Sequence, residues 1–197
     1  MAKDLRNMTL EELWELFPIT LSPHRPEWKI WAEEEISLLV NRLSKFRPSI
    51  NHIGSTAIDG ILSKPIIESK PIIDLLVEVN ENIGFDDIRQ LLEANGYTCM
   101  SAAGRRLSFN KGYTIQGYAE RVFHLHLRRE GDNTEINFRN YLNAHSDIAK
   151  EYEALKISLL PRYRNDRDAY TRAKTGFIER INRMAEDMRD GRLSQPE

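Results

Sequence analysis

Three short segments of this chain carry residue types that could bind a phosphorylated ligand. The first is His52-Ile53-Gly54-Ser55-Thr56-Ala57, in which a short expected strand runs into a Gly-Ser turn. Glycine has no β-carbon, so backbone N–H groups and a hydroxyl can approach a phosphate closely at such a turn. A Gly-Ser pair alone is a weak signal, because many strands end this way. Gly54, Ser55 and Thr56 are therefore candidate ligand-binding residues that need support from elsewhere.

The second segment is the apolar strand expected over residues 71–79, which carries two carboxylates. Asp74 and Glu78 share one face of it, because side chains alternate along a strand with period two. A carboxylate within such an apolar run is costly to bury unless it binds a metal or another cation. We expect Asp74 to be a metal ligand and a catalytic residue, with Glu78 as a further candidate ligand. The alternatives are a solvent-facing Asp74 paired with Lys70, and a Glu78 that belongs to the polar turn after the strand.

The third segment is a row of polar residues on the strand expected over residues 121–128. His124, His126 and Arg128 alternate with apolar residues and so share one face. Two imidazoles so spaced could bind one metal ion, or one of them could act as a general acid or base. We expect His126 to be the catalytic one. Arg128 could hold a phosphate oxygen. The alternative is an exposed sheet face with ordinary polar residues.

Other charged residues have weaker claims on a site. Four cations flank the central strands and could gather an anionic substrate, although each is equally consistent with an ordinary surface charge: Arg105, Arg106, Lys111 and Arg121. The C-terminal segment mixes basic residues with acids, a pattern typical of a solvated helix face: Arg162, Arg164, Arg167, Arg172 and Lys174. Cys99 lies in an expected strand and is interpreted as a packed side chain rather than a catalytic thiol.

These candidates must be positioned by a small sheet with helices around it. Thr9 with Glu12 forms a capping-box start for a short helix, and a second helix is expected from Pro26 to about residues 46–47. Strands are expected at residues 49–53, 71–79, 97–100, 107–110 and 121–128, with a helix at 86–94. From residue 135 to about 190 the pattern is helical. The sequence predicts an α/β (α+β) fold with a mixed sheet, flanking helices and C-terminal helices.

Length and composition limit the organisation and the partners. A chain of 197 residues suits one sizeable core, which we place at residues 23–190, after a helical extension at 1–22 and before a disordered tail at 191–197. The net charge of -2 argues against general nucleic-acid binding. The sequence has no apolar run long enough for a membrane span, one cysteine and no signal-like N-terminus, so we expect a cytoplasmic protein.

A duplicated hexapeptide complicates the position of the acid. Residues 63–68 read SKPIIE and residues 69–74 read SKPIID, differing only in the final acid. The repeat is too short for a solenoid unit. It is consistent with a duplicated loop over the site or with an alternative register of one strand. We favour Asp74 as the functional acid and keep Glu68 as the second candidate.

Several motifs in order resemble the GrpB family, whose fold belongs to the nucleotidyltransferase superfamily. The resemblance runs from about residue 26 to 185, and these segments carry it: His52-Ile53-Gly54-Ser55-Thr56-Ala57, Lys70-Pro71-Ile72-Ile73-Asp74, His124-Leu125-His126, Phe138-Arg139-Asn140-Tyr141-Leu142 and Asp168-Ala169-Tyr170-Thr171 with Ala173-Lys174. It implies a nucleotidyltransferase-like sheet, a Gly-Ser turn that holds a nucleotide triphosphate, and a strand carboxylate that binds divalent metal. The pattern usually has a second acid two residues after the first, where this chain has Leu76.

The resulting hypothesis is a nucleotidyltransferase-like protein that binds a nucleotide or other phosphorylated small molecule with Mg²⁺, or with Mn²⁺ or Zn²⁺. It would transfer a nucleotidyl group to a small acceptor, with Asp74 and a histidine at the metal and with Lys70, Lys111 and Arg128 contacting the substrate. One alternative is a non-catalytic module that binds a nucleotide or another anion. The other is a metal-dependent hydrolase built on His124 and His126.

Overall fold

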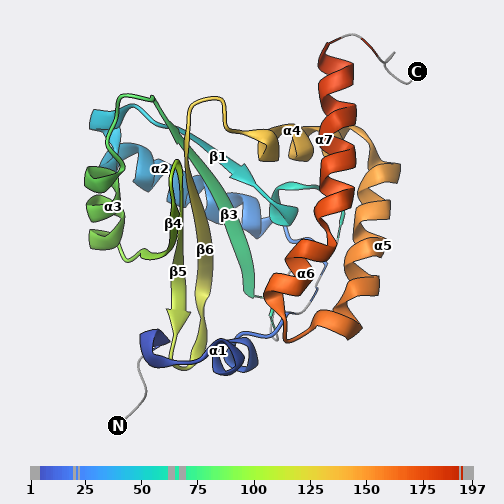
Figure 1. The fold of residues 1–197 in the computed structure, drawn as a ribbon, viewed down its shortest axis with the longest axis horizontal. Coiled ribbons are helices and arrows are strands. Elements are labelled where there is room, and N and C mark those ends of the chain that lie inside the picture. The colour runs from blue at the N-terminus through green and yellow to red at the C-terminus, as the bar shows by residue number, and fades with distance from the viewer. Residues whose placement is uncertain are drawn as a thin grey trace.

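The protein folds around one mixed sheet. The computed structural model describes residues 5–19, 21, 23–61, 65–66, 70–190 and 192. The strands are β1 (Ser49–Ile53), β2 (Pro65–Ile66), β3 (Lys70–Val79), β4 (Thr98–Ala103), β5 (Arg106–Thr114) and β6 (Gly117–Arg129). The sheet order is β1-β3-β6-β5-β4, with β2 pairing with β3, and β3 and β6 run parallel while the other neighbours are antiparallel. The expected mixed α+β class is confirmed (Figure 1).

Helices surround this sheet and extend to one side of it. They are α1 (Leu10–Leu16), α2 (Glu27–Arg42), α3 (Phe85–Ala94), α4 (Thr134–Ala144), α5 (Ser146–Tyr163), α6 (Arg167–Ala173) and α7 (Thr175–Arg189). Short 3-10 turns are η1 (Leu5–Asn7), η2 (Ser44–Phe46) and η3 (Ser55–Ala57). In the described part of the chain, each helix is too short or too polar to serve as a membrane span.

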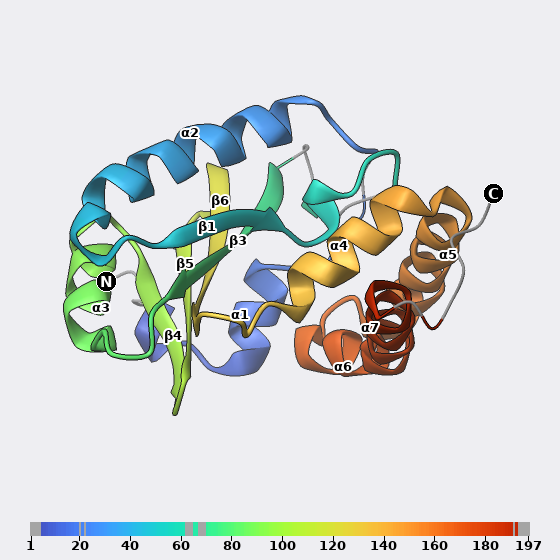
Figure 2. The ribbon, with the colours of Figure 1, turned by 90° about the horizontal axis from the view of Figure 1, so that it is seen from above.

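The first face of the sheet is apolar and is covered by α2 and α3. Alternate residues of β3, such as Ile73, Leu75 and Val77, point to this face and are completely buried. They pack with Trp28 and Leu39 of α2 in the largest apolar cluster of the protein. Figure 2 shows α2 lying along this side of the strands, while α1 and α6 lie on the opposite side.

The second face carries the other residues of β3 and β6, and with them the polar row. At one end Ile72 and Val122 pack with Phe17, which joins the N-terminal segment to the sheet. Beyond the sheet, a separate apolar cluster fills the space between α4, α5 and α7. Ile58 and Ile61, which follow β1, are part of that cluster, so the sheet and the C-terminal helices are packed into each other.

Most elements match the sequence-based expectations, with differences at their ends. The capping box at Thr9 and Glu12 is present. The second helix ends at Arg42 rather than at residues 46–47, because the chain tightens into η2 and Arg47 turns left-handed with a φ of 49°. The C-terminal helical run is divided into four helices. The tail at 191–197 lies outside the described residues apart from Arg192.

Candidate functional site

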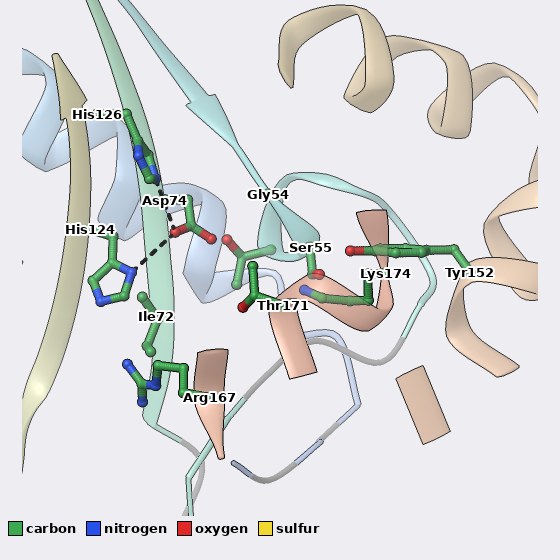
Figure 3. Close-up of a pocket in the computed structure, with 11 residues that line it drawn as sticks. Gly54, Ser55, Ile72, Asp74, His124, His126, Tyr152, Arg167, Thr171 and Lys174 are labelled. Carbon is green, nitrogen blue, oxygen red and sulfur yellow. Dashed lines mark ion pairs between the residues drawn. The ribbon is translucent and has the colours of Figure 1, made fainter. Parts of the chain in front are cut away.

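A cavity of about 250 Å³, lined by several polar side chains, lies where the second face of the sheet meets the C-terminal helices. We call it the first cavity. The sheet side contributes Gly54, Ser55 and Thr56 of the turn after β1, Ile72 and Asp74 of β3, and His124 and His126 of β6. The helical side contributes Tyr152 of α5, and Arg167, Thr171 and Lys174 of α6 and its C-cap (Figure 3).

Asp74 is at the centre of the sheet side. The parallel pairing of β3 with β6 aligns Asp74 with His124 and Leu76 with His126, so all three polar side chains share one face. Asp74 Oδ1 lies 3.6 Å from His124 Nδ1 and 3.8 Å from His126 Nε2 (Figure 3). Burial alone would raise the pKa of Asp74, but the two close imidazoles hold this pKa well below its usual range. The carboxylate is therefore ionised at neutral pH.

The ring of His126 is oriented by Arg128. The Arg128 guanidinium lies 3.3 Å from His126 Nδ1, and it also donates to the carbonyl oxygens of Leu107 and Leu127 at 3.1 Å. An arginine can only donate, so Nδ1 of His126 must accept. In the neutral ring the proton is then on Nε2, the atom that faces Asp74. Arg128 thus shares the polar row but acts from behind His126 rather than from the cavity wall.

The ring of His124 is oriented by a tyrosine and an arginine. Its Nε2 lies 2.7 Å from the hydroxyl of Tyr113, and that hydroxyl accepts from Arg167 at 2.6 Å. The hydroxyl proton of Tyr113 is then available to Nε2, which leaves Nδ1–H facing Asp74. Burial is the main reason that the pKa of His124 is lowered, so this ring is neutral at neutral pH. Both imidazoles therefore present N–H groups to one carboxylate.

The turn after β1 has no room for any residue but glycine. Gly54 has a φ of 72° and a ψ of −171°, a conformation that is essentially restricted to glycine. A β-carbon there would lie 2.3 Å from Asp74 Oδ2. Thr56 is fixed on the other side, because its hydroxyl lies 2.8 Å from His52 Nε2. The turn and the carboxylate are thus in direct contact, as a shared binding site requires.

Two cations on the helical side were not expected from the sequence. The interpretation of Arg167 and Lys174 as part of a solvated helix face is wrong: both line the first cavity, and Lys174 is only 8% exposed. Lys156, which is completely buried, is close enough to Lys174 for their charges to interact, and its ammonium group lies over the ring of Tyr152. The signal was present in the motif Asp168-Ala169-Tyr170-Thr171 with Ala173-Lys174, whose last residue reaches the cavity.

Several expected site residues lie elsewhere. Glu78 accepts from the backbone of Gly131 at 3.0 Å and from Asn133 at 3.1 Å, so it stabilises the turn after β6. Lys111 is on the first face of the sheet, where its Nζ lies 2.7 Å from Glu35 of α2. Neither lines the first cavity.

Most of the repeated hexapeptide segment, residues 63–74, has side chains outside the described part of the chain. Lys70 is part of β3, but its side chain is outside the described part, and Glu68 lies outside the described residues. The choice between the two acids therefore stays a prediction, in which Asp74 has the support of its position in the cavity.

The flanking cations are ordinary surface groups. Arg105 pairs with Glu81, Arg106 with Asp132, and Arg121 with Glu34, and each of the three arginines is exposed. Cys99 is half-buried against the main apolar cluster, as a packed side chain should be. None of these residues contributes to the first cavity.

The side chains of Asp74, His124 and His126 fit Mg²⁺ better than they fit Zn²⁺. Among the described residues, no three His, Cys, Asp or Glu side chains are arranged to hold a metal ion. The two imidazoles turn N–H groups rather than lone pairs towards Asp74, which does not suit a zinc site built on histidine. The Asp74 carboxylate suits Mg²⁺, which is commonly bound through one or two carboxylates together with substrate phosphates.

The fold and the site define the class of protein. A Gly-Ser turn follows the edge strand of a mixed sheet, and a carboxylate lies on the neighbouring strand, as expected from the sequence. The family model described as GrpB protein matches residues 18–184. This chain belongs to the GrpB family.

Individual relatives agree with this assignment. The chain is 34% identical to the glutamate-rich protein GrpB of Alkalihalophilus pseudofirmus over 83% of this chain and 93% of that protein. It is 34% identical to the UPF0157 protein YqkA of Bacillus subtilis over 73% of this chain, which is only 40% of that protein. A crystal structure of GrpB from Enterococcus faecalis matches with a TM-score of 0.69 and 28% identity, covering 84% of this chain and 96% of that one.

Proposed function

We propose that the first cavity binds the phosphate groups of a nucleotide, or of another phosphorylated small molecule, together with Mg²⁺. The observation that carries this proposal is the direct contact between Gly54 and Asp74, with Lys174 lining the same cavity. The backbone N–H groups and hydroxyl of the turn suit phosphate oxygens, and Lys174 adds a positive charge. Asp74 supplies the oxygen ligand that Mg²⁺ prefers.

The reaction that fits this arrangement is transfer of a nucleotidyl group to a small acceptor. When bound, Mg²⁺ would neutralise charge on the phosphates. The chain itself would do the positioning: the turn at Ser55 and Thr56 holds the phosphates, and His124 and His126 orient the Asp74 carboxylate.

A second candidate function is a module that binds the ligand without catalysis. The observation that favours it is Leu76, which is completely buried opposite His126 at the position where the resemblance places a second acid. A site with one carboxylate can still hold a metal–phosphate complex, but it lacks the second anionic ligand. Measurements of binding and of reaction separate the two candidates.

Binding is tested by calorimetric titration of the full chain with ATP, GTP, CTP and UTP, in Mg²⁺ and again in EDTA. We expect at least one nucleotide to bind more tightly with Mg²⁺, and Asp74→Asn to weaken its binding by about tenfold or more and to remove the Mg²⁺ dependence. The control is Asp147→Asn, which makes the same change at an exposed position of α5. Equal affinity of Asp74→Asn and the unmodified chain would contradict the proposal.

Reaction is tested by measuring pyrophosphate release in the presence of a mixture of small hydroxyl compounds. Release that requires Mg²⁺ and is lost in Asp74→Asn supports nucleotidyl transfer. Tight binding of a nucleotide without release over long incubation favours the non-catalytic module. Binding that is equally strong in EDTA favours it as well, because no metal then takes part.

A further inference from the structure

A second polar cavity, of about 300 Å³, adjoins the first and shares Thr56 with it. It is formed by parts of the chain that are far apart in sequence: Lys29 of α2, His52 of β1, and Arg139 and Asn140 of α4. Its volume is at the lower end of the range of small-molecule sites. Nothing proposed above for the first cavity uses these four residues.

The walls of this second cavity are fixed by hydrogen bonds between those distant segments. Arg139 donates to the backbone oxygen of His52 at 2.6 Å, and the His52 ring contacts the Thr56 hydroxyl. Asn143 donates to the oxygen of Ala57 at 3.0 Å and accepts from the backbone of Asp59 at 3.0 Å. The cavity is therefore held in shape before any ligand enters, which lowers the entropic cost of binding.

The polar groups that remain available in the second cavity are mostly donors. Lys29 has no ion-pair partner among the described residues, and the contacts of Arg139 there use only three of its five N–H groups. Asn140 uses its oxygen to accept from Arg139, which leaves its NH₂ group for a ligand. Asp59 is the one carboxylate in the lining, and its side chain is 74% exposed.

The charge of the second cavity is positive at neutral pH. Burial lowers the pKa of His52 to about 4, so its ring is uncharged there. Lys29 and Arg139 then outweigh Asp59, whose charge is weakened by solvent. Two cations and an amide NH₂ around a preformed space are the groups that recognise phosphate and carboxylate oxygens.

We propose that the second cavity is a separate binding site for a small organic anion, a phosphate monoester or a carboxylate, held by Lys29, Arg139 and Asn140. Asp59 at its edge can accept from a hydroxyl of the same molecule. The site does not depend on the function of the first cavity. It also gives a role to His52 and to the Arg139-Asn140 pair, none of which lines the first cavity.

The test is an NMR titration of the ¹⁵N-labelled full chain, without nucleotide and in EDTA. Inorganic phosphate, glycerol 3-phosphate and glycerate are used as separate probes. We expect saturable shifts at the amides of His52, Thr56 and Asn143 with at least one probe. Tighter binding of glycerol 3-phosphate identifies a phosphate site, and tighter binding of glycerate identifies a carboxylate site.

Variants assign those shifts to the site. Lys29→Glu reverses an exposed charge and should weaken binding by about tenfold or more, whereas Lys150→Glu, the same change on α5, should not. Asp74→Asn alters the first cavity and should leave the affinity within about twofold. Non-saturable shifts with all three probes would overturn the proposal. So would equal weakening by the two lysine variants, or loss of binding in Asp74→Asn.

Discussion

At the first cavity, the contacts that a residue makes restrict which side chain can stand at its position. Gly54 touches the Asp74 carboxylate in a backbone conformation that other residues avoid. The structure also offers a matched comparison. Gly60 has a nearly identical φ of 75°, but a β-carbon there would meet nothing within 4 Å.

Gly54→Ala should therefore be far more harmful than Gly60→Ala. Gly54→Ala adds a steric clash with Asp74 to the backbone strain, for a loss of about 2 to 5 kcal/mol in the free energy of unfolding. Gly60→Ala carries only the strain, about 1 kcal/mol. Urea unfolding of both variants measures the difference, and equal losses would show that the contact between Gly54 and Asp74 is unimportant.

Lys156 carries an amino group whose charged form is disfavoured by its buried surroundings. It is completely buried, and burial, together with the nearby Lys174, lowers its pKa from 10.5 to about 7. Between pH 7 and 10.5 the unfolded chain then binds more protons at this position than the folded chain does. The free energy of unfolding must therefore rise with pH across this window, and the penalty for burying the charge is present in full below it.

Lys156→Met should remove this contribution. It should be more stable than the unmodified chain at pH 7, and its stability should lack a slope of up to about 1.4 kcal/mol per pH unit between pH 7 and 10.5. Lys150→Met, at an exposed position of the same helix, is the control and should keep the slope. Urea unfolding at several pH values gives the comparison. Identical profiles for the two variants would mean that Lys156 is protonated throughout.

Elements are held together at the first cavity by Arg167 of α6. Its guanidinium donates to the hydroxyls of Tyr113 on β5 and Tyr118 on β6, and also to the backbone oxygen of Phe17. It thus joins α6 to the sheet and to the N-terminal segment. Tyr113 in turn contacts His124, so the position of α6 and the orientation of that ring depend on each other.

Arg167→Met should loosen α6. A hydrogen bond from a charged group stabilises a fold by about 1.5 to 3 kcal/mol, and bonds that share one side chain do not add in full, so we expect a loss of about 2 to 4 kcal/mol. Amide hydrogen exchange should accelerate most in α6 and at Ile19, which bonds to the oxygen of Arg164. Arg172→Met on the same helix, at an exposed position, should change neither quantity. Uniform acceleration across the protein would contradict a local tether.

Across the whole molecule, the sequence was informative where a pattern is local. Strand alternation placed Asp74 on one face of its strand and His124 and His126 together on one face of theirs, and the pairing of β3 with β6 brings these to the same face of the sheet. The glycine turn was visible directly in the sequence. Glu78 shares that alternation, but four residues along a strand are about 13 Å, which carries it to a different turn. To place the Lys111 side chain, one must know which face of β5 meets α2. To place Arg167 and Lys174 in the first cavity, one must know how α6 packs over the sheet, and the hydrophobic periodicity of the sequence does not give this packing.

The last prediction concerns the number of units that unfold. The sheet and the C-terminal helices have separate apolar clusters, but Ile58 and Ile61 follow β1 in the chain and pack among α4, α5 and α7. Neither part can therefore open without exposing buried surface of the other, and we expect one cooperative transition.

The chain provides two independent probes of this transition. Its three tryptophans, Trp14, Trp28 and Trp31, are all in α1 and α2, so their fluorescence reports on the sheet and its cover. Circular dichroism at the helical band comes mainly from α4 to α7, which together hold more helical residues than α1 to α3. The two urea transitions should coincide. They should also shift together in Leu125→Ala, within the sheet, and in Leu142→Ala, within α4, each by about 2 to 5 kcal/mol. Separate midpoints, or a variant that moves only one of them, would divide the protein into two domains with the first cavity at their boundary.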